Sequence, residues 1–330
     1  MKVLITGANG FIGSHLTEAL LDKGYSVRCL LRKTSDLSWL APLEEKSSGR
    51  LEFVYGDICD KESLRAVVGD VDYVYHVAGL VKAHRPQRYY EVNVEGTRNL
   101  AEVTRDISPN IKKFVFFSSL AASGPSDDGH LLKELETSHP VTDYGKSKRD
   151  AEDLLKNDFS SKLPVVVIRP PIIYGPRDRG FYFYFKIVKK GIIPVTGKKI
   201  SACFVSDLVK GAILAAESKA SDSQVYFISD PVPFSPESIG RTIAKFLQVD
   251  AKKIKVPAFI VMAAGFLSQF ISDLSGKITI FNIQKAREMV QPYWVCDVSK
   301  ARAELGFKAS IDIEEGIRIT VDWYKKRGWL

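Results

Sequence analysis

The amino-acid sequence predicts an α/β fold in which a doubly wound parallel sheet carries helices on both faces. Short apolar runs rich in β-branched residues alternate with stretches of helical spacing through the first half of the chain. A glycine-spaced turn joins the first run to the first helical stretch. The chain has 330 residues, 45% of them hydrophobic and 26% charged, which is the balance of a globular protein rather than a disordered one.

The predicted elements follow one another in the order that a parallel sheet needs. Strands that alternate with helices imply right-handed crossovers, and crossovers place helices on both faces of the sheet. The predicted strands are residues 2–6, 26–31, 51–55, 71–77, 113–118 and 163–169, and the predicted helices are residues 11–23, 87–105 and 144–157.

The pattern loosens after residue 170. Pro170-Pro171 and then Tyr174-Gly175-Pro176 interrupt it and indicate a loop. A short strand at 225–228 and a helix at 235–247 follow. We therefore expect a sheet domain over residues 1–170 and a smaller lobe over residues 171–330, interleaved into one body with a cleft.

The net charge of +8 comes from 47 basic and 39 acidic residues. Such a surplus suits an anionic small molecule or an anionic membrane surface, and it is equally typical of a basic surface without a partner. The sequence has no dense block of Lys and Arg interleaved with aromatic residues, the pattern of nucleic-acid binding. We expect no nucleic-acid partner.

Cysteine and histidine usage predicts a cytoplasmic chain without a bound metal. The four cysteines are scattered with no Cys-x-x-Cys pair, and the five histidines are dispersed. The first apolar run is too short for the core of an export signal, and no uncharged apolar run reaches the length of about 18 residues that a spanning helix needs.

The turn after the first strand has the glycine spacing of a phosphate-binding loop. It runs from Thr6 to Gly13 with the pattern G-x-x-G-x-x-G and opens the first helix. The glycines allow a tight turn and let backbone N–H groups approach a pyrophosphate, which the helix N-terminus faces. We predict a dinucleotide-binding, Rossmann-type domain over residues 1–170. The residues predicted to contact the cofactor here are Gly7, Asn9, Gly10, Phe11, Ile12 and Gly13.

The end of the second predicted strand indicates which dinucleotide binds. An acidic residue there would accept the ribose hydroxyls of NAD. This chain has Arg32 and Lys33, followed by two hydroxyl residues, and its first acid is Asp36. Two cations suit a 2′-phosphate, so NADP is favoured. The alternative is that both are ordinary surface cations beside a site for NAD.

Tyr144 and Lys148 are candidates for acid–base chemistry. They are four residues apart on a predicted helix, so both side chains point the same way. A phenol is a poor acid–base group at neutral pH, and a nearby ammonium moves its pKa towards the working range. Ser118 and Ser119 end the fifth predicted strand, where a hydroxyl can hold a substrate carbonyl.

Taken together, these motifs resemble the extended short-chain dehydrogenase/reductases, the superfamily of NAD(P)-dependent epimerases, dehydratases and ketone reductases. The resemblance covers nearly the whole chain. It is carried by residues 6–13, 56–58, 76–79, 93–99, 119–124, 140–152, 169–176 and 204–208.

The resemblance implies roles for individual residues. Tyr144 is the acid–base residue and Lys148 its partner, Asn93 organises a proton relay, and Ser119, with Ser118 as the alternative, holds the reacting oxygen. It also implies a substrate-binding role for residues 171–330 and a homodimer formed through helices 87–105 and 144–157. Further cofactor contacts are implied for Asp57, Ile58, Val77, Ala78, Gly79 and Pro171, besides Tyr144 and Lys148.

Departures from the pattern indicate the branch. The acid pair of sugar-nucleotide dehydratases is replaced by Leu120-Ala121, and the two polar residues with which epimerases hold the substrate are replaced by Ile172 and Ile200. The chain is most similar to the dihydroflavonol reductases and 3β-hydroxysteroid dehydrogenases, through residues 27–32 and 118–121.

We therefore predict hydride transfer between a nicotinamide and a secondary alcohol or ketone on a largely apolar small molecule. A nucleotide-sugar epimerase using the same Ser-Tyr-Lys triad is the alternative. A non-catalytic NADP-binding sensor is a third reading, although such sensors usually lose the Tyr or the Lys.

Residues 256–272 form an uncharged stretch flanked by Lys252, Lys253 and Lys255 and, on the far side, by Lys277. One interpretation is a buried helix of the smaller lobe or a dimer contact. The other is an interfacial helix that rests on an anionic bilayer and admits an apolar substrate, which would make the protein membrane-associated. We expect the substrate pocket to be lined by residues 80–88, 123–132 and 172–185, the last including the aromatic run 181–185.

Overall fold

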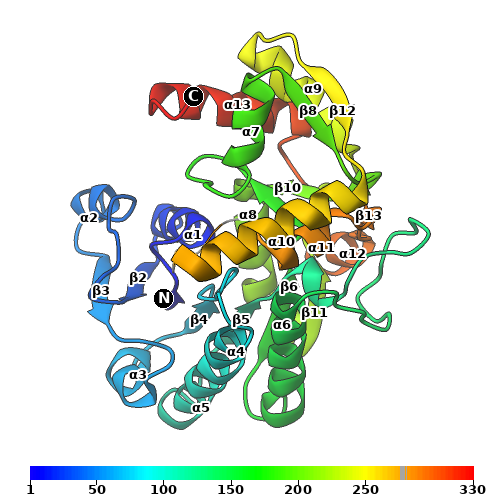
Figure 1. Cartoon of the computed structure of the whole chain (residues 1–330). Helices are drawn as coiled ribbons and strands as arrows, with labels where there is room; N and C mark the ends of the chain where they lie inside the picture. Colours follow the sequence, from blue (N-terminus) through cyan, green and yellow to red (C-terminus); the bar gives the residue numbers. More distant parts are fainter. Residues whose placement is uncertain (276–278, 280) are drawn as a thin grey trace.

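The computed structural model describes residues 1–275, 279 and 281–330, and Figure 1 shows their arrangement. This part of the chain contains a seven-stranded sheet of order β11-β6-β5-β4-β1-β2-β3, in which every neighbouring pair is parallel. The predicted α/β fold is confirmed. The sheet strands are β1 (Lys2–Thr6), β2 (Ser26–Leu31), β3 (Leu51–Tyr55), β4 (Tyr73–His76), β5 (Lys113–Phe117), β6 (Val165–Arg169) and β11 (Gln224–Phe227).

Two layers of helices cover the sheet, and each layer has its own apolar core. Side chains alternate along each strand between the faces, so Val3 and Ile5 pack on one side and Leu4 on the other. One face is covered by α1 (Phe11–Asp22), α8 (Val205–Glu217) and α12 (Ser299–Leu305). The other is covered by α3 (Lys61–Val68), α5 (Gly96–Ile107) and α6 (Asp143–Leu154), which continues into the π-helical turn η3 (Leu155–Phe159).

The smaller lobe lies above the carboxyl edge of the sheet in Figure 1 and has a separate apolar core. β11 returns from this half of the sequence to pair with β6, so the lobe and the sheet domain are interleaved. The lobe and its connections contain α7 (Tyr182–Lys189), α9 (Pro236–Leu247), α10 (Ala258–Ser275), α11 (Ile283–Met289) and α13 (Ile313–Lys326), with β7 (Ile172–Tyr174), β8 (Ile192–Val195), β9 (Lys199–Ile200), β10 (Ala202–Phe204), β12 (Lys252–Lys255) and β13 (Tyr293–Trp294). Shorter segments are α2 (Ala41–Lys46), η2 (Leu120–Ala122) and η4 (Lys219–Ser221).

The helix predicted over residues 87–105 is divided in the structure. It consists of α4 (Gln87–Tyr90), the π-helical turn η1 (Glu91–Glu95) and α5. A π-turn inserts one extra residue, which rotates the following side chains relative to the helix axis. The extra residue falls around Asn93, and this turn therefore bears on the predicted site.

The helix α10 lies on the surface. Most of its large apolar side chains are exposed, so the interpretation of residues 256–272 as a buried helix is wrong. Within the described residues it is long and apolar enough to cross a membrane by length and composition, with 17% of its 18 residues buried. Lys277, one of the predicted flanking lysines, lies outside the described residues.

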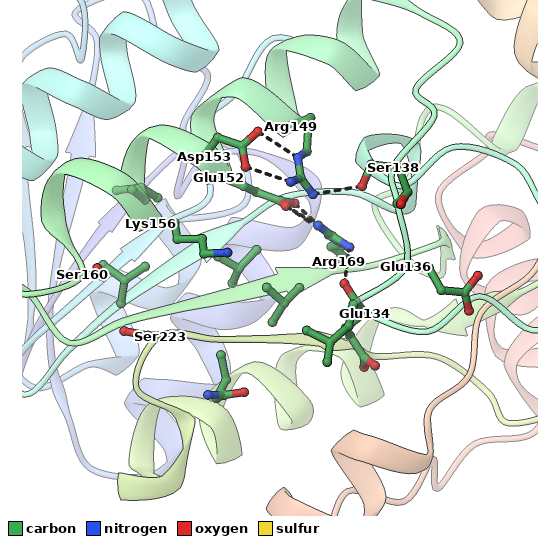
Figure 2. Close-up of a pocket in the computed structure, with 17 residues that line it drawn as sticks. Glu134, Glu136, Ser138, Arg149, Glu152, Asp153, Lys156, Ser160, Arg169 and Ser223 are labelled. Carbon is green, nitrogen blue, oxygen red and sulfur yellow. Dashed lines mark hydrogen bonds and ion pairs between the residues drawn. The ribbon is translucent and has the colours of Figure 1, made fainter.

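A buried ion pair joins α6 to the end of β6. The Arg169 guanidinium donates from Nε to the Glu152 carboxylate at 2.9 Å, and both side chains are at most 5% exposed. Figure 2 shows this pair beside a cavity of about 440 Å³, together with the more exposed pair of Arg149 and Asp153. Two carboxylates of adjacent residues in α6 thus sit in very different surroundings.

We predict that Glu152→Gln lowers the free energy of unfolding by about 3–5 kcal/mol, because the buried Arg169 charge loses its counter-ion. The neighbouring substitution Asp153→Asn, in the exposed pair, is expected to cost less than about 1 kcal/mol. Urea denaturation of both variants measures the difference. Equal losses would contradict the assignment of Glu152–Arg169 as the structural pair.

Candidate active site

The phosphate loop lies between β1 and α1, and the N-terminus of α1 that follows it has no side-chain cap. Gly7 adopts a left-handed backbone with φ of 70°, and a Cβ atom there would lie 2.7 Å from the Ala78 nitrogen. A Cβ atom at Gly13 would collide with the Gly7 carbonyl oxygen. Gly10 is the N-cap of α1 and provides no side-chain hydrogen bond to it, so the first N–H groups of the helix remain available to a ligand.

The predicted cofactor residues follow the carboxyl ends of neighbouring strands. Because β3, β2, β1 and β4 are adjacent and parallel, residues after each of them meet at one edge. The Asp57 backbone N–H donates to Ser63 Oγ, which fixes the turn after β3, and Ile58 is buried against Gly96. Pro171 follows β6 at the same edge.

Two arginines, one within β2 and one just after it, have different surroundings. Arg28 is buried, binds Glu52 at 2.9 Å and donates to the carbonyl oxygens of Val67 and Gly69. Arg32 is exposed just beyond the end of β2, as is Lys33. Arg28 therefore holds the fold together, and Arg32 and Lys33 are the cations that a ligand at this edge can reach.

A buried hydrogen-bond chain supports the turn after β4. Thr6 Oγ1 lies 2.7 Å from His76 Nδ1, and Thr97 Oγ1 lies 2.9 Å from His76 Nε2. Thr97 donates to the Asn93 carbonyl oxygen and Thr6 accepts from the Ala78 N–H, so the neutral imidazole carries its proton on Nε2. Burial, and then the Lys148 charge, lower the pKa of His76 to about 3. Val77, Ala78 and Gly79 follow this support directly.

Asn93 is placed by the π-turn η1 and is 1% exposed. Its Oδ1 accepts from the Leu80 N–H at 2.7 Å, and its Nδ2 donates to the Leu80 carbonyl oxygen and to Ser147 Oγ. The side chain thus ties the loop after β4 to the helix α6. A Cβ atom at Gly79 would lie 3.0 Å from Lys148 Nζ and 3.4 Å from Asn93 Oδ1, so the absence of a side chain there keeps these two groups accessible from the turn.

The two serines after β5 face different partners. The Ser119 hydroxyl accepts from the Ala121 N–H at 3.1 Å and lies close enough to Tyr144 to lower the pKa of its phenol. The Ser118 hydroxyl instead donates to the buried Glu152 carboxylate. The sequence left both serines as candidates for holding the reacting oxygen, and the geometry places Ser119 beside the phenol and Ser118 in the structural ion pair.

Burial controls the titration of Tyr144 and Lys148. It raises the pKa of Tyr144 to about 12; the Ser119 hydrogen bond lowers the pKa and the Glu288 carboxylate raises it. Lys148 Nζ donates to the Phe117 carbonyl oxygen at 2.7 Å, and burial lowers its pKa to about 8. Lys148 is not among the groups that shift the pKa of Tyr144, so the expected lowering by the ammonium is absent in this structure. Burial dominates, and the phenol is protonated at neutral pH.

A cavity of about 190 Å³ adjoins Tyr144. Its other described lining residues are Val81, Lys82, Tyr89, Asn282, Gln284, Lys285 and Glu288. Val81 and Lys82 come from the loop that the sequence predicted for the pocket. The residues of α11 were missed, because a short helix with mixed charges carries no sequence signal that links it to a site about 140 positions earlier.

The helix α11 is bound to the N-terminal end of α6. Gln284 Nε2 donates to the Asp143 carboxylate at 2.6 Å, and its Oε1 accepts from the Asp143 N–H. Thr142 Oγ1 donates to Glu288 at 3.4 Å.

The aromatic run 181–185, which the sequence placed at the substrate pocket, lies elsewhere. Four of its residues pack in the core of the smaller lobe, and Phe183 is exposed.

Comparison with known proteins identifies the family. The model of the NAD dependent epimerase/dehydratase family matches residues 3–229, which is more than half of the chain, so the chain belongs to this family. It is an extended short-chain dehydrogenase/reductase. The glycine-lined loop, the uncapped start of α1 and the turn at Gly79 fit the nicotinamide dinucleotide that the family requires.

Two relatives and one solved structure illustrate the similarity. Ceramide reductase from Caulobacter vibrioides is 29% identical over 331 residues, covering 99% of this chain and 96% of the relative. Sterol-4-alpha-carboxylate 3-dehydrogenase, decarboxylating, from Saccharomyces cerevisiae is 27% identical over 351 residues, covering 98% and 97%. UDP-glucuronic acid 4-epimerase from Bacillus cereus, in complex with UDP-glucuronic acid and NAD, shares the fold with a TM-score of 0.77 at 24% identity, covering 99% of this chain and 100% of that one.

The buried His76 predicts a pH dependence of stability. The folded chain leaves it neutral down to about pH 3, whereas in the unfolded chain it binds a proton below about pH 6.5. The free energy of unfolding is therefore highest above pH 6.5 and falls as the pH drops, by about 1.4 kcal/mol per pH unit from this group. We expect His76→Asn to show a shallower loss between about pH 6.5 and pH 5 in urea denaturation.

His130 is the matched control. It is exposed, and hydrogen bonds to Glu136 and Asp128 raise its pKa, so its contribution is present at low pH and lost as the pH rises. The His130→Asn variant is expected to keep or steepen the acid loss of stability. A His76→Asn variant as steep as the wild type would show that His76 is protonated in the folded chain.

Proposed function

We propose that this protein transfers a hydride between a nicotinamide cofactor and a secondary alcohol or ketone on a largely apolar small molecule. The observation that carries the proposal is the cavity lined by Tyr144, close to which Ser119 lies, with Lys148 and Asn93 facing the turn at Gly79. In this arrangement a substrate oxygen that enters the cavity reaches the Tyr144 phenol, and we assign the second contact with that oxygen to the nearby Ser119 hydroxyl.

The chemistry divides between the cofactor and the protein. A nicotinamide bound at this edge supplies or accepts the hydride at its C4 atom. Tyr144 donates its phenolic proton to the substrate oxygen in reduction and takes it back in oxidation, and the Ser119 hydroxyl holds the same oxygen. The protonated state of Tyr144 at neutral pH suits the reductive direction.

Lys148 and Asn93 prepare the site for this proton transfer. The Lys148 ammonium is within reach of a ribose placed against Gly79, and it offsets the negative charge that Tyr144 acquires when it gives up its proton. Asn93 holds Leu80 and Ser147, which keeps the turn after β4 and the helix α6 at a constant separation.

NADP is the cofactor that we favour over NAD. Arg32 and Lys33 are exposed at the end of β2, where the 2′-position of the adenine ribose lies in this class of site. Asp36, the first acid beyond them, accepts from the Ser38 N–H at 2.9 Å and is held within its own turn. The remaining contacts are proposed for the phosphate loop, Asp57, Ile58, Val77, Ala78, Gly79 and Pro171.

The apolar substrate is supported by the two named relatives, whose names specify a ceramide and a sterol carboxylate. It is supported too by the replacement of polar residues by Ile172 and Ile200, both of which lie in strands of the smaller lobe. The alternative is a nucleotide-sugar epimerase, which the shared fold with the Bacillus cereus enzyme favours. A thermal-shift panel of nucleotide sugars beside a turnover panel of ketones distinguishes these two functions from a non-catalytic NADP sensor.

We propose further that residues 1–170 bind the cofactor and residues 171–330 mainly bind the substrate. The scattered cysteines support a cytoplasmic protein, and the resemblance supports a homodimer formed through residues 87–105 and 144–157, which comprise α4, η1, most of α5, and α6 with the start of η3. The protein also makes peripheral contact with a membrane through residues 256–272, which form most of the exposed helix α10.

The substitution Tyr144→Phe removes only the phenolic hydroxyl. We expect the turnover number to fall by roughly 10²–10⁴-fold, the usual scale of lost acid–base catalysis, while the cofactor dissociation constant stays near the wild-type value. Lys148→Ala is expected to lower the turnover number and also to weaken cofactor binding. Single-turnover absorbance at the reduced-nicotinamide band measures the first and calorimetry the second. Near-normal turnover of Tyr144→Phe on a ketone would refute the proposed mechanism.

The cofactor preference is tested by Arg32→Asp. The change removes a charge-assisted contact worth about 1.5–3 kcal/mol and adds repulsion to the 2′-phosphate, so preference is expected to move from NADPH towards NADH. Arg28→Lys is not a suitable control, because Arg28 is buried in the fold; Lys46→Asp in α2 is an exposed alternative. Tighter binding of NADH than NADPH by the wild type would overturn the preference.

A further inference from the structure

One face of α10 is a continuous stripe of exposed apolar side chains. We call it the α10 stripe. Its members recur at helical spacing over the length of the helix, so they lie along one side of it. Each is between 46% and 75% exposed, and they are Phe259, Ile260, Phe266, Leu267, Phe270, Ile271 and Leu274.

The opposite face of α10 is packed closely on α11. Val261, Gly265 and Ser272 are the buried residues of the helix. A Cβ atom at Gly265 would lie 2.6 Å from Ala286 Cβ, and Ser268 Oγ donates to the Phe281 carbonyl oxygen at 2.6 Å. The helix is therefore held with the stripe outward, and the stripe faces away from the core that the rest of the lobe shares.

Exposed cations flank both ends of the stripe. Before the helix, β12 contributes Lys252, Lys253 and Lys255, of which Lys253 pairs with Glu237. At the other end, His84 Nδ1 lies 3.3 Å from Ser272 Oγ, which places the loop of residues 81–86 beside the end of α10. That loop exposes Lys82 and Arg85. Asp273 is the single acid within α10.

This charge pattern favours an anionic bilayer over a second copy of the chain. If two stripes paired in parallel, the lysines of β12 would face each other, and if they paired antiparallel, they would face Lys82 and Arg85. Either arrangement sets cations against cations around an apolar contact. An anionic lipid surface instead neutralises both ends while the apolar side chains enter the boundary between headgroups and acyl chains.

The stripe and the catalytic cavity belong to one connected unit. The helix α11, on which α10 packs, lines the cavity beside Tyr144 with Gln284, Lys285 and Glu288. The loop next to the end of α10 lines the same cavity with Val81 and Lys82. Val81 is 66% exposed as well as lining the cavity. A surface that contacts the α10 stripe therefore lies close to this side of the cavity.

We infer that the α10 stripe docks on the surface of an anionic bilayer and holds the Val81 side of the catalytic cavity at the lipid. This deepens the membrane contact proposed above by naming the contacting face, the lipid charge and the orientation of the cavity. An amphiphilic substrate then passes from lipid to Tyr144 without crossing bulk water, with its polar part meeting the α11 side chains and its apolar part remaining near the stripe.

Vesicle flotation tests the docking without any turnover measurement. The full-length protein is expected to rise with vesicles rich in phosphatidylserine at low salt, to remain at the bottom with phosphatidylcholine alone, and to be released by high salt because exposed charges are then screened. The double variant Leu267→Glu with Phe270→Glu is expected to lose at least about tenfold in partition coefficient. Leu267→Ala with Phe270→Ala removes apolar area without adding charge and is expected to be weakened less.

A matched control distinguishes the stripe from apolar exposure in general. Val232→Glu with Phe183→Glu places the same charges at side chains of nearly equal exposure, 59% and 54% against 58% and 54%, outside α10. This control is expected to float like the wild type. Equal loss in both charged variants, or no flotation of the wild type, would overturn the proposal. A wild-type dimer that the Leu267→Glu, Phe270→Glu variant breaks, without flotation, would assign the stripe to a second copy.

The orientation is tested with an environment-sensitive fluorophore attached at Val81→Cys in a Cys59→Ser background, since Cys59 is the exposed native cysteine. Its emission is expected to shift to the blue on phosphatidylserine vesicles, and a label at Leu135→Cys, which lines the other cavity, is expected to stay unchanged. No shift at position 81, or equal shifts at both, would overturn the orientation. Because neither assay needs turnover, a failed ketone panel would count against the proposed function and leave this result standing.

Discussion

The close approach of the backbone at Gly7 to the backbone at Ala78 is the constraint on which the site depends. These residues follow β1 and β4, the neighbouring strands at which the sheet order reverses direction, and a side chain at Gly7 would separate them. Because the contact is so tight, Thr6 can reach both His76 and the Ala78 N–H. The phosphate loop is thereby held beside the turn at Gly79, and that turn faces Lys148.

Burial is the dominant electrostatic influence around this contact. It lowers the pKa of His76 and of Lys148 and raises that of Tyr144, in each case disfavouring the charged form. Charge is retained where a partner compensates for it, as in the pair of Arg169 and Glu152 one turn further along α6. The helix α6 thus presents the protonated Tyr144 towards the cavity and Glu152, paired with Arg169, towards the sheet. The phenolic proton therefore remains available to a substrate oxygen.

The surface of the smaller lobe follows a different rule. Among the described residues most large apolar side chains are buried, yet most of those in α10 are exposed, because the helix packs mainly on α11 through a narrow face around Gly265. The same α11 binds the start of α6 through Gln284 and lines the cavity. One short helix, α11, therefore contacts both the exposed helix α10 and the cavity beside Tyr144. The proposed lipid contact and the proposed site for the apolar substrate lie on either side of this helix.

The sequence by itself determined six of the seven sheet strands, the phosphate loop and the spacing of Tyr144 and Lys148, because each depends on periodicity or on neighbours a few residues away. It placed the strand at 225–228 in the smaller lobe, whereas β11 pairs with β6 in the main sheet. The choice of Ser119 over Ser118 rested on family resemblance alone, and the sequence did not show that Ser118 would bind Glu152, that Arg28 would be buried while Arg32 stays exposed, or that a π-turn would place Asn93. The tertiary structure decided these points, along with the place of α11 beside Tyr144 and the outward face of α10. The physical reason is that burial and hydrogen-bond partners come from segments far apart in the chain, so local pattern leaves them undetermined until the layers pack.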